Sequence, residues 1–303
     1  MNWIMNINWI TNADTIIFDY SFNTELDIQL ISPYEKLIFS DYKLSYSLFK
    51  YYENDEFYDL TIYRNKFNQN IPKLSPFLTH LIFGYAFNRN ISNLPQGITH
   101  LTFGWSFNQD VSILPPFLTH LIFGYAFNQD VSFLPPSLTH LTFGYKFNQD
   151  VSNLPQNLTY LSFSSLFNHD ISNLPSTITH LFLGWKFAQK CVIPSNVKYL
   201  NFNSNNLFII DNLPNSIVEL ELEINFNLPM DNLPTSIKKL IICENGNFDA
   251  DLNCLPNFIE ELHLNFDYKK RILNIPQNLK KLVCNKNYPY INDFSMCEIE
   301  FYE

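Results

Sequence analysis

Histidine is concentrated at one position of a repeating sequence. Five of the seven histidines follow threonine and precede leucine, and they lie 20 or 40 residues apart. They are His80, His100, His120, His140 and His180, with Tyr160 at the place between the last two. A zinc site needs three or four ligands that converge at ~2 Å, whereas a row of residues on neighbouring strands offers only adjacent pairs. We therefore expect no metal in this row, and no cofactor.

Aspartate recurs with the same spacing, at Asp110, Asp130, Asp150 and Asp170. Stacked Asp turns could bind calcium, but calcium-binding solenoids use Gly- and Asp-rich nonapeptides, and this sequence has neither feature. We expect these carboxylates to be solvated at a turn. Catalysis needs a unique constellation in a pocket, and repeated positions are not unique. The sequence therefore predicts a protein that is not an enzyme, unless the irregular segment Ser40–Phe57 builds a pocket against the sheet.

A unit of 20 residues contains both positions, and from Ile98 it reads I-T-H-L-T-F-G-W-S-F-N-Q-D-V-S-I-L-P-P-F. Its positions 4 and 6 are apolar, which predicts a short strand that turns these side chains inward and the histidine at position 3 outward. Phe at position 10 would fill the coil, and Pro at position 18 would end it at a corner. The unit cannot also hold a helix of ~11 residues, so the return side should be extended or one 3₁₀ turn. The strands should then stack in parallel, ~4.8 Å apart.

Two further positions of the unit indicate backbone requirements. Glycine at position 7 implies either a positive φ angle or a close approach of backbone. It occurs as Gly84, Gly104, Gly124, Gly144 and Gly184. Asparagine at position 11 is expected to bond backbone groups of the neighbouring turn. It occurs as Asn68, Asn88, Asn108, Asn128, Asn148 and Asn168.

The motif F-N-Q-D-V-S-F-L-P-P-S-L-T-H-L-T-F-G-Y, residues 127–145, resembles the FNIP repeat, a relative of the leucine-rich repeats. The resemblance implies a mainly β fold, a leucine-rich-repeat-like parallel β-solenoid with about fourteen rungs of about 20 residues. It also implies a non-catalytic interaction module. The family is common in social amoebae and in large DNA viruses that infect amoebae. Some members carry an F-box ahead of the repeats, which recruits ubiquitin-ligase machinery.

The repeat divides the chain into three parts. Residues 1–15 are expected to form an N-terminal cap or a degenerate rung, because a solenoid end needs a cap. Residues 16–285 are expected to form the solenoid. Residues 286–303 should close its C-terminal end.

The first rungs are anchored at Ile16 and Leu37. The pattern then loosens over Ser40–Phe57, which we interpret as an insertion, and the register restarts at Leu60 and Ile62. Because Ile16 and Leu37 already belong to rungs, we expect no F-box in this sequence.

Charge and composition exclude several classes of function. The net charge of −10 argues against nucleic-acid binding, which depends on cationic contacts to phosphate. No stretch approaches the ~18 apolar residues of a membrane helix, and Met1–Ile10 has neither a basic region nor a cleavage-like site. The number of cysteines is odd and none forms C-x-x-C, which favours reduced thiols. We expect a cytoplasmic monomer, in the host cell if the protein is viral.

The outward face of the sheet is the candidate surface for an unidentified protein partner. Its residues are His80, His100, Thr102, His120, His140, Thr142 and His180. The stacked imidazoles should be neutral at pH 7 and charge only at acid pH. Further along the chain the histidine position becomes charged with alternating sign, as Glu219, Lys239, Glu261 and Lys281.

Two alternative functions remain open. One is a substrate-recognition subunit that acts with a ubiquitin ligase without an F-box of its own. The other is glycan binding by the aromatic residues at position 8, although strand alternation predicts that these point inward. They are Tyr85, Trp105, Tyr125, Tyr145 and Trp185.

Overall fold

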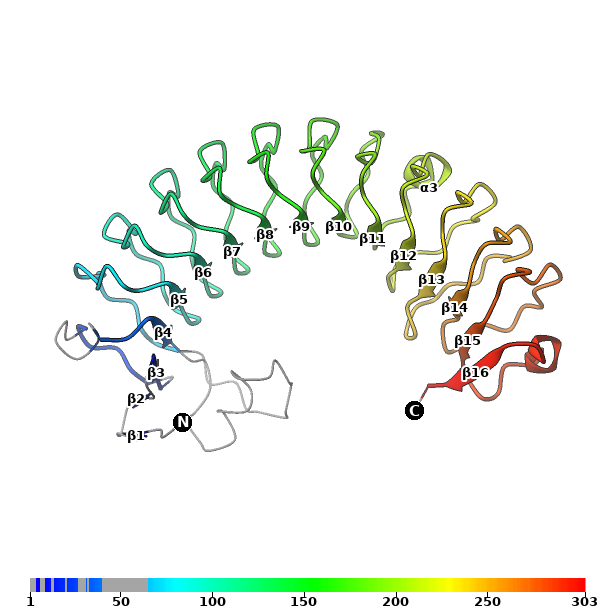
Figure 1. Cartoon of the computed structure of the whole chain (residues 1–303), viewed down its shortest axis with the longest axis horizontal. Helices are drawn as coiled ribbons and strands as arrows, with labels where there is room; N and C mark the ends of the chain where they lie inside the picture. The colour runs from blue at the N-terminus through cyan, green and yellow to red at the C-terminus, as the bar shows by residue number, and fades with distance from the viewer. Residues whose placement is uncertain are drawn as a thin grey trace. The chain divides into compact units, whose positions relative to one another are not determined.

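The computed structural model describes residues 4–5, 9–11, 14–19, 21–26, 31, 33–39 and 65–302. The chain divides into two compact units, residues 1–149 and residues 150–303. Each unit is a succession of coils, and each coil contributes one short strand (Figure 1). The segment Ser40–Phe57 and the rung expected at Leu60 and Ile62 lie outside the described residues.

In the first unit, strands β3 to β8 pair in parallel and in chain order. Equivalent residues of successive copies lie opposite one another, as Leu81 and Leu101 do. β4 pairs directly with β5, so that Leu37 lies opposite Leu81 although residues 40–79 separate the two strands in sequence. The bounds are β3 Thr15–Phe18, β4 Lys36–Phe39, β5 His80–Ile82, β6 His100–Thr102, β7 His120–Ile122 and β8 His140–Thr142.

The N-terminal segment pairs in the opposite direction. β1 (Ile4–Met5) is antiparallel to β2 (Trp9–Thr11), and β2 is antiparallel to β3. The parallel ladder therefore begins at β3. Between β5 and β8 the return segments consist of turns and extended chain, as the length of the unit predicts.

The second unit contains eight parallel strands, again in chain order. β16 pairs in parallel with β15, so the ladder continues into the segment 286–303. Two short helices, α3 (Leu207–Asp211) and η1 (Ile291–Phe294), lie on the return side. The strands are β9 Tyr160–Ser162, β10 His180–Leu183, β11 Tyr199–Phe202, β12 Glu219–Leu222, β13 Lys239–Ile242, β14 Glu261–His263, β15 Lys281–Cys284 and β16 Glu298–Phe301.

Six parallel strands in the first unit and eight in the second make fourteen among the described residues. The predicted leucine-rich-repeat-like parallel β-solenoid with about fourteen rungs is therefore confirmed. The rung expected at Leu60 is not part of this count, and β16 supplies the fourteenth strand instead.

Phenylalanine at position 10 forms an internal stack in the first unit. Phe87, Phe107 and Phe127 are fully buried, and successive ring centroids lie 6.2 Å apart with planes within 7°. Each of these rings also stacks on the phenylalanine that directly follows the strand of its own coil, as Phe87 does on Phe83 at 3.7 Å. Every coil therefore buries its large side chains against the equivalent side chains of the next coil.

Glycine at position 7 is required by a close approach of backbone. A Cβ atom at Gly124 would overlap the carbonyl group of Gly104, and a Cβ atom at Gly104 would overlap that of Gly84. None of the position-7 glycines has a φ angle in the left-handed region. Of the two reasons that the sequence left open, close approach is the one that applies.

The asparagine column bonds backbone from coil to coil, as predicted. The Oδ1 atom of Asn88 accepts from the backbone N–H of Asn108 at 3.0 Å, and that of Asn108 accepts from Asn128 at 2.9 Å. The side chain of Gln109 donates to the same oxygen of Asn88 at 2.9 Å. These bonds satisfy turn N–H groups that the short strands leave unpaired.

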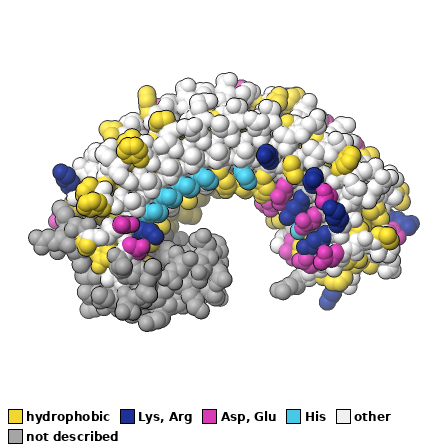
Figure 2. Space-filling model, viewed as in Figure 1, with side chains coloured by type: hydrophobic (Ala, Val, Ile, Leu, Met, Phe, Trp, Pro, Cys, Tyr) yellow, Lys and Arg dark blue, Asp and Glu magenta, His cyan; other side chains and the backbone are white. Residues whose placement is uncertain are grey.

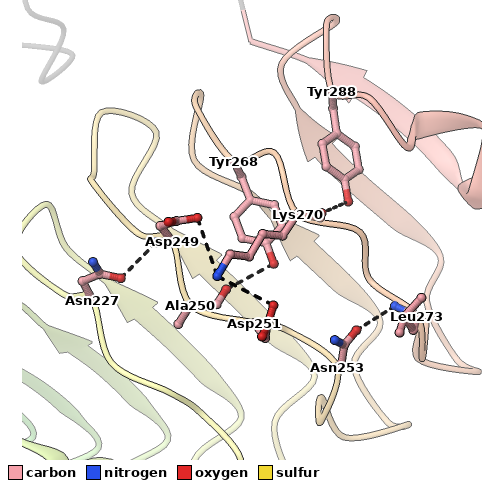
Figure 3. Close-up of polar contacts among 9 residues, drawn as sticks. All are labelled: Asn227, Asp249, Ala250, Asp251, Asn253, Tyr268, Lys270, Leu273 and Tyr288. Atoms are coloured by element: carbon pink, nitrogen blue, oxygen red, sulfur yellow. Dashed lines mark hydrogen bonds and ion pairs between the residues drawn. The ribbon is translucent and has the colours of Figure 1, made fainter.

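Tyrosine replaces phenylalanine in the stack of the second unit. The ring of Tyr268 lies 6.1 Å from those of Phe248 and Tyr288. The hydroxyl of Tyr268 donates to the carbonyl of Ala250 at 3.2 Å, and that of Tyr288 donates to the carbonyl of Lys270 at 2.8 Å (Figure 3). Burial is the main cause that raises the pKa of both phenols. Each hydroxyl thus links its coil to the preceding one.

Candidate functional site

The histidines of the first unit form a stacked row on the outward face of the sheet. His80, His100, His120 and His140 occupy four consecutive strands, and each of the three neighbouring pairs has ring centroids 4.2 Å apart. The planes of these pairs deviate by 12° at most. Figure 2 shows histidine side chains as a continuous line on this face. The register of the parallel strands stacks the rings, because it places equivalent residues side by side.

The threonine that precedes each histidine holds its ring. Thr99 Oγ1 donates to the carbonyl of Thr79 at 3.2 Å and lies 2.9 Å from His100 Nδ1. Thr119 repeats both contacts with Thr99 and His120, at 3.0 Å and 2.9 Å. Each hydroxyl thus links the backbone of the preceding strand to the imidazole next to it and fixes the orientation of that ring.

The environment keeps these imidazoles neutral. Burial is the first cause that lowers the pKa of His80, His100 and His120. The charge of Lys36 adds to the effect at His80, and the neighbouring imidazoles add to it at His100. For His120, with a histidine on each side, the pKa is lowered to about 4. These rings therefore stay uncharged at neutral pH.

The rest of this face is also uncharged. Thr102 and Thr142 are half-buried beside the histidines, and Ile122 between them is 45% exposed. His180 lies in the second unit, where its ring neighbours are the tyrosines Tyr160 and Tyr199, with centroids at 6.3 Å and 5.7 Å. The structure thus brings together six of the seven candidate residues on β5 to β8, and places the seventh in a different surrounding.

The aromatic residues at position 8 are not inside the coil, so the expectation from strand alternation was wrong. Trp105 is 45% exposed, and its ring stacks on those of Tyr85 and Tyr125 at 5.6 Å and 3.9 Å. The alternation does not apply because the strands end at position 5 and position 8 lies in a turn. A sugar would need an open ring face to stack on, and neighbouring rings cover both faces of Trp105 and Tyr125. The geometry therefore does not favour glycan binding at these two rings.

The aspartates are turn residues. Asp110 is exposed and accepts from the backbone N–H and the hydroxyl of Ser112, at 2.8 Å and 2.9 Å. These bonds lower the pKa of its carboxyl group, the backbone bond most. Asp130, Asp150 and Asp170 bond the serine two residues on in the same way. In the part of the chain that the structure describes, no group of three or more His, Cys, Asp or Glu residues is placed to hold a metal ion.

The equivalent face of the second unit carries ion pairs. Lys239 Nζ lies 3.5 Å from Glu219 Oε1 and 3.7 Å from Glu261 Oε1, so the alternating charges pair across strands. Figure 2 shows acidic and basic side chains gathered over this region. Sequence reasoning missed Phe182, Glu221 and Glu223 on the same face. The sequence does contain a sign of them. At position 5, Phe182 and Glu221 replace the threonine or isoleucine of the regular coils, and at position 7 Glu223 replaces their glycine.

No helix within the described ranges has the length and the apolar character that crossing a membrane would need. All five cysteines are free thiols.

Comparison with known proteins identifies the repeat. The family model described as FNIP Repeat matches residues 87–113, 107–146, 147–186 and 188–225. Among solved structures, a similar one is CroV588, described as a novel circular LRR protein structure, with 26% identity and a TM-score of 0.63. The alignment covers 93% of this chain and 51% of CroV588, so this chain spans about half the length of that protein.

A second similar structure is the functional domain of InlJ from Listeria monocytogenes, described as including a cysteine ladder. It has 17% identity and a TM-score of 0.56, with 87% of this chain and 61% of that chain covered. It supports the fold alone. No curated protein matches the sequence.

Proposed function

This chain is an FNIP-repeat protein, and we propose that it is a non-enzymatic protein-interaction module that binds a partner protein through the neutral sheet face of its first unit. That face consists of His80, His100, Thr102, His120, Ile122, His140 and Thr142. Leucine-rich-repeat folds are stacked coils that expose an extended sheet surface, which suits the recognition of another macromolecule.

The observation that carries the proposal is the row of stacked imidazoles, each held by the threonine before it. Thr99 and Thr119 fix the rings, so His100 and His120 present equivalent imidazole groups at the regular spacing of the strands. A partner would offer hydrogen-bonding groups to this row and an apolar group to Ile122, which is 45% exposed. Binding here buries no charge, so it avoids the desolvation cost of an ionised side chain.

The free thiols support a reducing compartment, and the proposal places the interaction in the cytoplasm. The histidine and aspartate positions repeat from coil to coil and form no unique constellation, which favours binding over catalysis.

The experiment compares two substitutions of exposed isoleucines by glutamate. Ile122→Glu places a charge in the centre of the neutral face, whereas Ile113→Glu makes the same change at a turn, where the side chain is 67% exposed. Tagged parent and variants are used to purify partners from the native cell under identical conditions. We expect the parent and Ile113→Glu to retain the same partner and Ile122→Glu to lose it. Loss with Ile113→Glu and retention with Ile122→Glu would place the binding surface at the turns.

A further inference from the structure

The outward face of β9 to β11 in the second unit carries a cluster of aromatic rings. Phe182 lies between Tyr160 and Tyr199, with centroids 5.0 Å and 5.1 Å away. The planes meet at 43° and 46°, so these rings do not cover one another face to face as the position-8 rings do. All three side chains are half-buried, and burial raises the pKa of the Tyr160 phenol.

Two carboxylates lie beside this cluster, Glu221 on β12 and Glu223 directly after that strand. Glu221 accepts a hydrogen bond from the hydroxyl of Tyr199, and Glu223 Oε1 accepts from Asn201 Nδ2 at 2.7 Å. Among the described residues, neither carboxylate forms an ion pair with a lysine or arginine. Glu219 on the same strand, in contrast, is paired with Lys239 at 3.5 Å. The face thus holds two negative charges that neutral donors orient and no cation balances.

The fold does not require these residues. The inward leucines Leu161, Leu181, Leu200 and Leu220 remain fully buried and identical to those of the regular coils. The departures occur at positions 3, 5 and 7, where the first unit has His, then Thr or Ile, and then Gly. Because inward positions decide how the coils stack, this combination of rings and carboxylates is a property of the surface.

We propose that the sheet face formed by Tyr160, Phe182, Tyr199, Glu221 and Glu223 binds an arginine side chain presented by a basic, extended segment of a partner protein. A planar guanidinium group stacks on aromatic faces and donates paired N–H groups to carboxylates. Hydrogen bonds between ionised groups are the strong ones. Tyr199 and Asn201 hold the acceptors in place before the cation arrives. This site does not depend on the neutral face of the first unit.

The test uses fluorescence anisotropy with two labelled Gly/Ser peptides of equal length. One contains two arginines, and the other contains citrulline, the neutral analogue of arginine, at the same places. We expect the parent protein to bind the arginine peptide at least roughly tenfold more tightly than the citrulline peptide. Equal binding of the two peptides, or no measurable binding of the arginine peptide, would overturn the proposal.

Two matched variants separate a site from general attraction to an acidic protein. The double change Glu221→Gln with Glu223→Gln should weaken arginine-peptide binding roughly tenfold or more. Glu298→Gln with Glu300→Gln removes the same charge from the exposed strand β16 and should leave binding within about twofold. An equal loss with both double variants would show non-specific attraction and contradict the proposal.

A third variant tests the rings. Phe182→Thr introduces the residue that regular coils have at the equivalent position, as in Thr102 and Thr142, so the coil should still stack. We expect it to weaken arginine-peptide binding several-fold through the lost ring contact, with an unchanged circular dichroism spectrum. If a folded Phe182→Thr variant binds the arginine peptide as tightly as the parent, the aromatic cluster is not part of the site and the proposal is wrong.

Discussion

The sheet faces of the two units have the same scaffold and different chemistry. On β5 to β8 the outward residues are uncharged, and four imidazoles stack at 4.2 Å. On β12 to β16 the same position carries Glu and Lys, and Lys239 pairs with carboxylates on both neighbouring strands. The leucines beneath the two faces, such as Leu121 and Leu240, are equally buried. In this solenoid the inward residues that stack the coils are therefore separate from the outward residues of the sheet face. The chemistry of that face can change from coil to coil while the interior stays the same.

The interiors of the two units also differ. The stack of the first unit is made of phenylalanine and requires glycine at position 7, where successive turns approach closely. In the second unit the stack ends in tyrosines, and side chains such as Asn203 and Asn285 occupy position 7. Asn203 Oδ1 accepts from the backbone N–H of Asn225 in the next coil at 3.2 Å, and Asn285 Nδ2 donates to the carbonyl of Phe266 in the preceding coil at 3.0 Å. Side chains of the second unit thus form hydrogen bonds between coils at the position where the first unit has glycine.

The largest effect is expected from the phenylalanine stack. Phe127→Ala removes a fully buried ring that stacks on the rings of Phe107, Phe123 and Phe147, and should lower the free energy of unfolding by about 3–5 kcal/mol. The control Phe117→Ala removes a ring that is 65% exposed and should change stability by less than about 0.5 kcal/mol. Urea denaturation measures both. Equal midpoints for the two variants would refute the internal stack.

Glycine at position 7 should be the next most sensitive feature. Gly124→Ala forces a Cβ atom against the carbonyl of Gly104, and backbone cannot move aside as a flexible side chain can. We expect a loss of about 1–3 kcal/mol, as for other overpacked sites. In the second unit, Asn203→Ala should be milder, because a side chain is already accommodated there. A smaller loss for Gly124→Ala than for Asn203→Ala would reverse this comparison of the two turns.

Much of the fold follows from the repeat itself. The inward positions of Leu81 and Phe83, the phenylalanine stack and the asparagine column depend only on the period and on residue type, and the structure agrees with each. Glycine at position 7 left two explanations open, because sequence cannot separate a positive φ angle from a close approach. Strand alternation misplaced Trp105 because it holds only within a strand, and this strand ends three residues earlier at Thr102.

The candidate sites were harder to predict from the sequence than the fold. The histidine column could be placed on the outward face, but the orientation of its rings depends on contacts such as those of Thr99 Oγ1, which lies within hydrogen-bonding distance of a carbonyl and of the ring. The contact of Phe182 with Tyr160 and Tyr199 joins three different coils. Irregular positions of separate coils give no period to detect, so only the strand register shows that they meet.

Tyrosine in the stack of the second unit should contribute a moderate amount. Tyr268→Phe keeps the buried ring and removes the hydrogen bond to the carbonyl of Ala250. We expect a loss of about 0.5–1.5 kcal/mol in the free energy of unfolding, the net value of such a bond. The reverse change in the first unit, Phe127→Tyr, adds a hydroxyl to a fully buried position and should destabilise. A stabilised Phe127→Tyr variant would show that the two stacks are interchangeable.

The smallest effect concerns the charge state of the histidine row. Its pKa values are lowered, to about 4 for His120, whereas a histidine in the unfolded chain has a pKa of about 6.5. As the pH falls below that value, the unfolded chain takes up protons that the row does not, so stability falls with decreasing pH. The triple change of His100, His120 and His140 to Gln should flatten this dependence between about pH 7.5 and pH 5. Because the rings remain partly solvated, the difference should be less than about 1 kcal/mol.

Salt concentration separates the two physical causes of this pH dependence. Burial is the first cause of the lowered pKa at His100 and His120, and repulsion between neighbouring imidazoles follows it. At about 1 M NaCl the Debye length is ~3 Å, so repulsion across the row would be screened, while the effect of burial would persist. We therefore expect the urea midpoint of the parent to fall between pH 7.5 and pH 5 at low and at high salt, and that of the triple variant to fall less at both. A pH dependence that is present at low salt and vanishes at high salt would instead show that mutual repulsion between the imidazoles is the dominant cause of their lowered pKa values.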